Sequence, residues 1–441
     1  MKYVPNFDKN FRPAYLAVTE FLAKGTRPFS ICVERNSGYV YRYDMKITDD
    51  IDESYDVVER IVKSILWVVG GFKVYVAGSN EIYERLVDAY IKDGGARQFD
   101  RDFMARVYES KFEVVSCDFD TLPKKNEVSV PVGGNTKGCR IGFDAGGSDR
   151  KVSAVIDGEP VYSEEVVWFP KTNSDPAYHY EGILTAMKTA ASHMPRVDAI
   201  GVSSAGVYVD NRIMVASLFI KVADDDFEKH VKNMYIDVAK EIGAPVVVAN
   251  DGDVTALAGA MELNDNNVLG IAMGTSEAAG YINGEGCLMG WLNELAFVPC
   301  DFNKGAMVDE WSGDYGCGVK YFSQDSVIKL AEYAGLTVEG NSPAEKLKFV
   351  QNLNAQGNEI AGKIFEDIGI YLGHTIAYYS LFYDIKHLLL LGRVTSGKGG
   401  ESIMEYARKV LAEEYPHLGV QISMPDEKNR RVGQSVAAAS L

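Results

Sequence analysis

The chain has 441 residues, with 45 Lys and Arg against 62 Asp and Glu, which gives a formal net charge of −17. That length allows two or three domains with large cores. The acidic balance opposes non-specific binding to nucleic acid, which depends on Lys and Arg that neutralise phosphates. No apolar stretch is long enough for a membrane helix, and residues 1–10 are polar, unlike a signal peptide.

The six cysteines are scattered without the spacing of a disulfide framework. We therefore expect free thiols in a reducing compartment, and we infer a cytoplasmic location. Together with the acidic charge, this predicts neither a nucleic-acid partner nor a membrane partner.

Residues 1–137 are expected to form an α+β domain of their own. Apolar runs around the turn residues 36–38 predict a hairpin over 29–47. Helical spacing predicts a helix over 52–69, and a strand over 73–77 and a helix over about 80–93 follow it. No helix-turn-helix pattern is visible, so we expect this domain not to bind DNA. Residues 124–137 are polar and rich in glycine, as a linker would be.

The stretch 139–148, CRIGFDAGGS, is typical of a phosphate-binding loop. A β-like run ends at Asp144, whose carboxylate can face a metal, and Gly146 and Gly147 let backbone N–H groups approach an anion. Ser148 completes the loop. Taken alone, the pattern also fits an ordinary hairpin turn, so its interpretation depends on the motifs that follow.

A second polar motif follows a buried strand predicted over 246–249. This strand delivers Asn250 and Asp251, and open α/β sheets place their chemistry at the carboxyl ends of parallel strands. Asp251 can also cap the helix predicted over 254–262, and this structural role is compatible with a chemical one.

A third motif follows the apolar strand predicted over 268–273. Gly274 offers a bare amide and Thr275 a hydroxyl, which makes a second candidate phosphate loop. Glu277 would place a negative charge where this loop should meet phosphates.

Residues 392–398 have the spacing of a Walker A loop between a strand predicted over 387–391 and a helix over 401–414. However, Gly399 stands where that motif needs a Ser or Thr for magnesium. Only residues 400–441 follow, too few for the sheet of a P-loop domain, so we favour another interpretation.

Taken in order, the motifs resemble those of the ROK family (repressor, ORF, kinase) of the actin-like ATPase and sugar kinase superfamily. The matching segments are residues 141–148 (IGFDAGGS), 248–253 (VANDGD), 274–275 (GT), 293–297 (NELAF), 316–323 (GCGVKYFS), 391–392 (LG) and the Ala-rich end, 432–441. The resemblance implies an α/β protein with the two-lobed actin-like ATPase (ribonuclease H-like) fold, in addition to the N-terminal α+β domain. Its lobes would be residues 138–253 and 254–441, with the final helix returning to the first lobe, and they should close over the substrates.

The resemblance also implies a function, the ATP-dependent phosphorylation of a sugar hydroxyl on a hexose or an amino sugar. Asp251 would accept the proton of the attacking hydroxyl as general base. The residues that orient the sugar would be Asn250, Glu294 and Ser217. The nucleotide would be ATP with Mg²⁺, and Asp144 would lie near the metal. The residues that hold the nucleotide would be Asp144, Gly146, Gly147, Ser148, Gly274, Thr275, Gly392 and Arg393. A homodimer is compatible with this resemblance.

The sequence departs from the family pattern in several places. Family members often bind a structural zinc through a His and a Cys cluster, but Phe297 replaces the His and only Cys317 of the thiols is in place. We therefore expect no zinc. Ser217 stands where the sugar loop usually has Asn, and Arg393 stands where the adenosine side usually has Gly.

Two alternatives to an active ROK kinase remain open. Glu277 and Arg393 favour a sugar sensor or scaffold that keeps the site without turnover. The BadF/BadG-type ATPase and N-acetylglucosamine kinase group shares the Asp-x-Gly-Gly and Asn-Asp motifs, although Glu294 favours the ROK family. We favour an active kinase because Asp144 and Asp251 have no strong structural reason to occur together.

Overall fold

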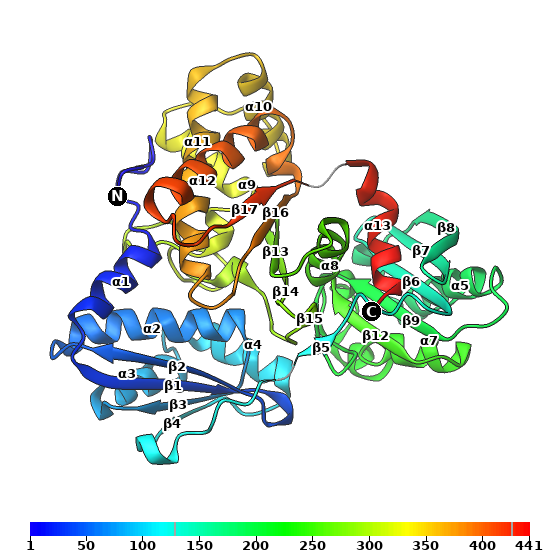
Figure 1. Ribbon diagram of the computed structural model, residues 1–441, viewed down its shortest axis with the longest axis horizontal. Helices are drawn as coiled ribbons and strands as arrows, with labels where there is room; N and C mark the ends of the chain where they lie inside the picture. Colours follow the sequence, from blue (N-terminus) through cyan, green and yellow to red (C-terminus); the bar gives the residue numbers. More distant parts are fainter. Residues whose placement is uncertain (128, 425–426) are drawn as a thin grey trace. The chain divides into compact units, whose positions relative to one another are not determined.

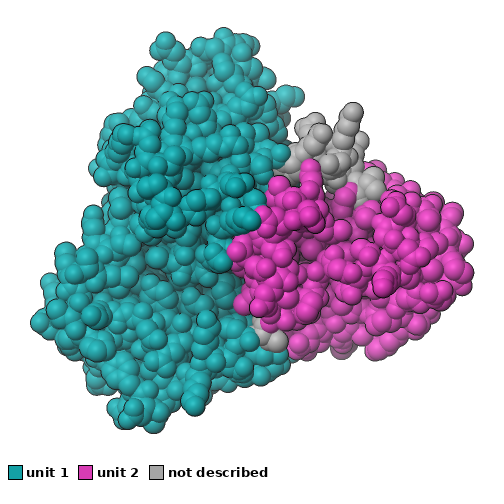
Figure 2. Space-filling view, in the orientation of Figure 1, with its two compact units in different colours: residues 1–128, 271–279, 291–424 teal, residues 129–270, 280–290, 425–441 magenta. Residues whose placement is uncertain are grey.

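The computed structural model describes residues 1–127, 129–424 and 427–441. The chain divides into two units, each assembled from separated segments of sequence (Figures 1 and 2). Unit 1 comprises residues 1–128, 271–279 and 291–424, and unit 2 comprises residues 129–270, 280–290 and 425–441. Among the described helices, none is long and apolar enough to cross a membrane.

The first part of unit 1 is an α+β layer. Its four-stranded sheet has the order β2-β1-β3-β4. The strands are β1 (Arg27–Glu34), β2 (Val40–Ile47), β3 (Lys73–Ala77) and β4 (Glu113–Ser116), and the helices are α1 (Ala14–Lys24), α2 (Ile51–Val68), α3 (Asn80–Tyr90) and α4 (Gln98–Tyr108). The predicted hairpin, helix 52–69 and strand 73–77 are confirmed, whereas α1 and α4 were not predicted.

Helix α2 is central to this layer because it is buried along most of its length. The side chain of Asp50 caps its start by accepting the N–H of Glu53 at 3.0 Å. Apolar residues line it at helical spacing, and charged residues inside it are buried as well.

The second part of unit 1 contains a four-stranded sheet with the order β14-β13-β16-β17. Its strands are β13 (Val268–Met273), β14 (Glu277–Ile282), β16 (His387–Leu391) and β17 (Gln421–Ser423), and its longer helices are α9 (Gln324–Tyr333), α10 (Pro343–Ala355), α11 (Glu359–Tyr379) and α12 (Lys398–Glu414). Helices α11 and α12 pack closely because Gly369 and Gly373 leave room for the facing helix. The strands predicted over 268–273 and 387–391 are confirmed.

Unit 2 is built on a five-stranded sheet with the order β12-β9-β6-β7-β8. Its strands are β6 (Cys139–Ala145), β7 (Asp149–Ile156), β8 (Glu159–Val167), β9 (Ala199–Ser204) and β12 (Val246–Asn250), and its longer helices are α5 (Pro176–Ala191), α7 (Met234–Ile242), α8 (Asp251–Leu263) and α13 (Glu427–Ala439). Strands β6, β9 and β12 are parallel, so their carboxyl ends lie at one edge of the sheet. Strands β6, β7 and β8 follow one another as an antiparallel meander.

Helix α13 packs against β6 and β9 of this sheet (Figure 1). A side chain at Gly142 would overlap the backbone of Ser435, and one at Gly201 would overlap that of Ala438. The helix can therefore approach the sheet only because both strand positions are glycine.

One predicted helix is wrong in its continuity. The sequence predicts one helix over about 226–242, but the structure divides this stretch into α6 (Asp224–Asp226), a π-helical turn over Phe227–Val231, and α7. The carbonyl of Lys232 accepts the N–H of Ile213 at 2.9 Å. It thus bonds to β11 (Arg212–Val215) instead of continuing a helix.

Candidate active site

The carboxyl ends of the three parallel strands of unit 2 bring the predicted acidic residues together. Register pairs Asp144 on β6 with Ser203 on β9, and Ser204 with Asn250 on β12. The Ser203 hydroxyl donates to the Asp144 carboxylate at 2.9 Å. Asp251 follows directly at the first position of α8. Five residues from three separate segments of the sequence thus line one edge.

Asp144 is buried, with 5% of its surface exposed. Burial raises the pKa of Asp144 to about 6, against the hydrogen bond from Ser203 and the charge of Lys151, whose Nζ lies 3.8 Å from the carboxylate. Asp251 also contributes to the raised value. Asp144 is therefore mostly ionised near neutral pH, and its charge favours a cation beside it.

The described residues fit a magnesium ion held with a nucleotide better than a metal held by protein alone. They contain no group of three or more His, Cys, Asp and Glu that could hold a metal. Magnesium usually binds one or two carboxylates, with phosphates and waters as its other ligands. Asp144 at the phosphate loop matches that requirement. The absence of zinc stays a prediction.

The loop after β6 has a cation over it that the sequence did not reveal. Gly147 is exposed, and a Cβ built on it would lie 3.1 Å from Cε and 3.3 Å from Nζ of Lys171. The charge of Lys171 also lowers the pKa of Asp251. Lys171 therefore lies over the loop at Gly147, near enough to the predicted base for its charge to act on Asp251.

Asp251 does not cap α8, which corrects the structural role predicted for it. The cap is Asn250, whose amide oxygen accepts the N–H of Gly252 at 2.7 Å, while its nitrogen donates to the carbonyl of Gly206 at 2.7 Å. The Asp251 carboxylate also accepts the N–H of Gly252, at 3.0 Å. Burial nevertheless raises the pKa of Asp251, against that bond and the charge of Lys171.

Gln434 is a second residue that sequence reasoning missed. From α13, its amide nitrogen donates to the carbonyl of Asp251 at 3.2 Å and to the hydroxyls of Thr255 and Ser203 at 3.2 and 3.4 Å. It joins the first turn of α8 to the end of β9. No local pattern marks it, because its partners are about 180 to 230 residues away.

Ser217, predicted to orient the sugar, begins a short 3-10 helix over Ser217–Phe219 and is exposed. That turn packs against the turn over Pro170–Thr172, which carries Lys171. Within unit 2, Ser217 thus belongs to the same group of loops as the phosphate loop.

In unit 1, the ends of β13 and β16 bring together the second phosphate loop and the predicted adenosine-side residues. Gly392 has φ 97°, and a side chain there would overlap the backbone of Met273. The Arg393 guanidinium donates to the hydroxyl of Thr275 at 3.5 Å. Gly274 is partly exposed and Thr275 exposed, so both can be reached by a ligand.

The structure corrects the expectation for Glu277. Its side chain is 3% exposed and lies against Gly318, and neither carboxyl oxygen has a hydrogen-bond partner among the described residues. Burial, with the charge of Glu294, raises the pKa of Glu277 well above its ordinary value. Glu277 therefore faces inward, in surroundings that disfavour its charge, and it does not oppose phosphates at the loop.

Glu294 is the N-cap residue of the 3-10 helix Leu295–Phe297 and is half-buried. Phe297, which stands in place of a family His, packs on Trp67 with ring centroids 4.2 Å apart. Cys317 is fully buried, and burial raises its pKa, against the charge of Lys63.

Comparisons with known proteins agree with this arrangement. The model of the ROK family matches residues 140–438. A ROK family glucokinase from Streptomyces griseus, solved with glucose and AMPPNP, is 22% identical at a TM-score of 0.50, and the match covers 68% of this chain and 98% of that one. A ROK hexokinase from Thermus thermophilus is 19% identical at a TM-score of 0.53, covering 68% and 96%.

A third similar structure is a ROK family transcriptional regulator, described as a homologue of the E. coli MLC protein. It is 17% identical at a TM-score of 0.53, and the match covers 69% of this chain and 78% of that one. A search of curated proteins found no match. These likenesses confirm the predicted α/β, actin-like ATPase fold. Because the family model spans more than half of the 441 residues, the chain belongs to the ROK family.

Proposed function

We propose that this protein transfers the γ-phosphoryl group of ATP to a hydroxyl of a hexose or an amino sugar. The proposal rests on the position of Asp251, a carboxylate with a raised pKa at the end of β12. Because Asn250 caps α8, Asp251 is not needed as the cap. Similar folds that are described as a glucokinase and a hexokinase support the same reaction. The chain belongs to the ROK family, which disfavours the BadF/BadG-type alternative.

Asp251 acts as the general base in this proposal. It accepts the proton of the attacking hydroxyl, a task that suits a carboxylate whose pKa lies nearer neutrality than usual. Lys171 offers its ammonium group to the transferring phosphoryl group, where negative charge must be stabilised. The hydrogen bonds of Gln434 hold the first turn of α8 against β9, which fixes Asp251.

The phosphates are held by backbone amides and short side chains. Unit 2 offers the amides of Gly146 and Gly147 and the hydroxyl of Ser148, and Asp144 would hold Mg²⁺. When bound, this ion would neutralise charge on the phosphates. Unit 1 offers the loop of Gly274 and Thr275, with Gly392 and Arg393 on the adenosine side.

The residues assigned to the sugar are Glu294, Ser217 and Asn250. Ser217 is exposed and Glu294 half-buried, so a ligand can reach both. In contrast, the Asn250 amide already binds two backbone groups, so it would contribute mainly by holding Asp251 in place.

A second candidate is a sugar sensor that binds without turnover. The fold is shared with a transcriptional regulator, and Arg393 departs from the usual glycine. However, Glu277 faces inward, in surroundings that disfavour its charge, which removes the other observation that favoured a sensor. The kinase is therefore the better-supported function.

The deciding experiment is a coupled ADP-release assay over a panel of hexoses and amino sugars, with calorimetry on the same panel. A kinase releases ADP with at least one sugar that also binds. Binding of a sugar without ADP release from any of them would favour the sensor. No binding and no turnover would contradict both functions.

A further inference from the structure

The α+β layer formed by residues 1–127 binds the backbone that carries Glu294. The last carbonyl groups of an α-helix have no partner within the helix. At the end of α2, two of them and the carbonyl of the C-cap residue Val69 accept N–H groups from one short stretch. The bonded pairs, donor first, are Glu294 and Trp67 at 3.0 Å, Asn293 and Val68 at 3.0 Å, and Leu292 and Val69 at 3.3 Å. Residues 292–294 thus cap α2.

A buried aromatic contact supports the same stretch. Trp67 is 0% exposed, and its ring packs on Phe297, with centroids 4.2 Å apart and planes at 32°. Its indole N–H donates to the carboxylate of Asp100 on α4 at 2.6 Å. The orientation of Trp67 is therefore fixed at both ends, and Phe297 rests on it. We call residues 292–297 the Glu294 segment.

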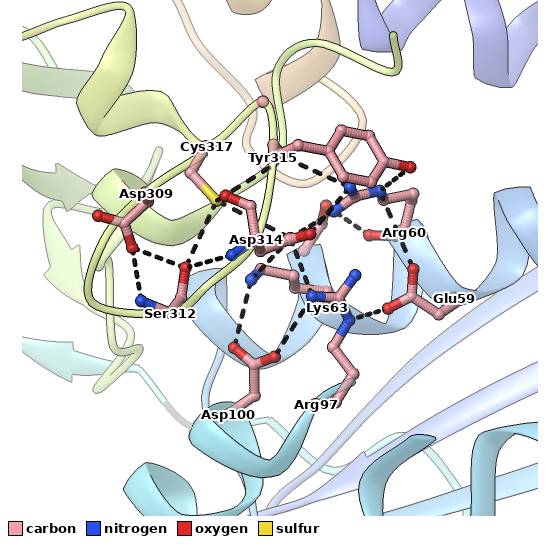
Figure 3. Close-up of polar contacts among 12 residues, drawn as sticks. Glu59, Arg60, Lys63, Arg97, Asp100, Asp309, Ser312, Asp314, Tyr315 and Cys317 are labelled. Atoms are coloured by element: carbon pink, nitrogen blue, oxygen red, sulfur yellow. Dashed lines mark hydrogen bonds and ion pairs between the residues drawn. The ribbon is translucent and has the colours of Figure 1, made fainter. Parts of the chain in front are cut away.

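One turn earlier on α2 begins a buried ion cluster (Figure 3). Its members are the acids Glu59, Asp100 and Asp314 and the cations Arg60, Lys63 and Arg97. All six are buried. Five of them belong to residues 1–127, and only Asp314 comes from the later part of unit 1.

Asp314 is the acid on which this cluster converges. It lies 2.9 Å from Nζ of Lys63, 3.0 Å from Nη1 of Arg97 and 3.1 Å from Nη2 of Arg60. Burial alone would raise the pKa of Asp314, but the charges of these cations hold that pKa well below its usual range. Without Asp314, three buried cations would face two acids. Uncompensated buried charge is strongly unfavourable, so the α+β layer needs this loop residue in place.

We propose that helix α2 positions the Glu294 segment for substrate, so that the N-terminal layer is a working part of the sugar site and not an appendage. Trp67 and Asp314 are the positioning residues. The role assigned to Glu294 rests on the proposed function. The positioning itself rests on the backbone bonds and the buried contacts above.

The test compares two equally buried large-to-small substitutions in the same layer of the full-length protein. Trp67→Ala removes the contact under the Glu294 segment. Ile82→Ala, on α3, is the matched control. Ile82 is also 0% exposed, whereas its helix packs on α2, α4 and β4 within the α+β layer. Hydrogen exchange at the amides of 292–294 is measured in both, together with sugar and ATP affinities by calorimetry.

We expect Trp67→Ala to accelerate exchange at these amides roughly tenfold or more, and Ile82→Ala to leave it within about twofold. Sugar affinity should fall roughly tenfold in Trp67→Ala, while ATP affinity changes by less than about twofold. Trp67→Phe keeps a ring against Phe297 and should recover most of both losses. Unchanged exchange in Trp67→Ala, or equal effects of the two alanine variants, would overturn the inference.

A second pair of variants covers the case in which Trp67→Ala does not fold. Asp314→Asn leaves an excess buried cation and should loosen the same amides, whereas Lys63→Met with Asp314→Asn restores charge balance and should recover their protection. Failure of the double variant to recover it would contradict the role of the cluster. If wild type binds no sugar at all, the proposed function fails, while the exchange comparison still decides whether α2 positions the segment.

Discussion

The amide oxygen of Asn250 accepts the N–H of Gly252 at 2.7 Å, so it is Asn250, and not its neighbour Asp251, that caps helix α8. This separates two roles that the sequence left combined. Asp251→Asn should therefore lower kcat by at least about 100-fold, because the amide keeps the size of the side chain but cannot accept the proton. Sugar affinity and melting temperature should change little. The measurement is steady-state kinetics with a sugar that wild type phosphorylates.

Asn250→Ala is the informative companion variant. Loss of the cap should destabilise the protein by about 1 kcal/mol, visible as a lower melting temperature. Equal kcat for wild type and Asp251→Asn would show that Asp251 is not the base.

Lys171→Met should reduce kcat/KM for ATP roughly tenfold or more, because it removes the ammonium group that we propose stabilises the transferring phosphoryl group. The charge of Lys171 lowers the pKa of Asp251, so its removal should raise that pKa and shift the acid limb of the pH–rate profile upward. Lys221→Met, at another exposed lysine of unit 2, is the control and should leave both unchanged. A rate loss without a shift of the acid limb would mean that Lys171 does not act on Asp251.

Asp144→Asn should make the protein more stable at pH 8 and inactive. Burial raises the pKa of Asp144 to about 6 from an ordinary value of 3.8. The folded state therefore binds the proton more tightly than the unfolded state, and stability falls as pH rises from about 4 to 6. A neutral Asn avoids this cost, which is about 3 kcal/mol for a shift of this size. Thermal unfolding at pH 8 and pH 4 should show the gain only at pH 8; an equal gain at both would point to a packing effect.

Glu277→Gln should retain activity, because the side chain is buried away from the loop and burial raises the pKa of its carboxyl, so an uncharged amide suits this position. Because the pKa of Glu277 is raised, ionising this carboxyl at high pH destabilises the fold. Glu277→Gln should therefore be more stable than wild type under alkaline conditions and similar in acid. The measurements are ADP release and unfolding across pH. Strong loss of activity in Glu277→Gln at full stability would give the proton of Glu277 a direct role.

We also expect no sequence-specific binding to DNA. The N-terminal layer is a four-stranded sheet whose helix α2 is buried, and the chain carries a net charge of −17. Selection of duplexes from a random pool by the full-length protein at about 0.15 M salt should enrich none. Recovery of a defined duplex would move this protein toward the regulators of its family.

Much of the sheet architecture was predictable from the sequence. Strands such as β6, β13 and β16 are apolar runs that end in turn residues, so local pattern and order sufficed to place Asp144 and Asp251. Lys171 and Gln434 were not predictable, because each acts on residues that only the fold brings near. The orientation of Glu277 was predicted wrongly, because its position two residues after Thr275 does not reveal that β14 turns its side chain inward.

The two glycines beneath α13 constrain how this protein can be altered. Any side chain at Gly142 or Gly201 would displace the helix whose Gln434 binds the backbone of Asp251 and the hydroxyl of Ser203. A variant at either glycine could thus lose turnover without touching substrate. In a mutational library built to change sugar preference, positions 142 and 201 should be kept constant. Diversity should be placed at Ser217, which is exposed, and at Glu294, whose bond to α2 is made by its backbone N–H.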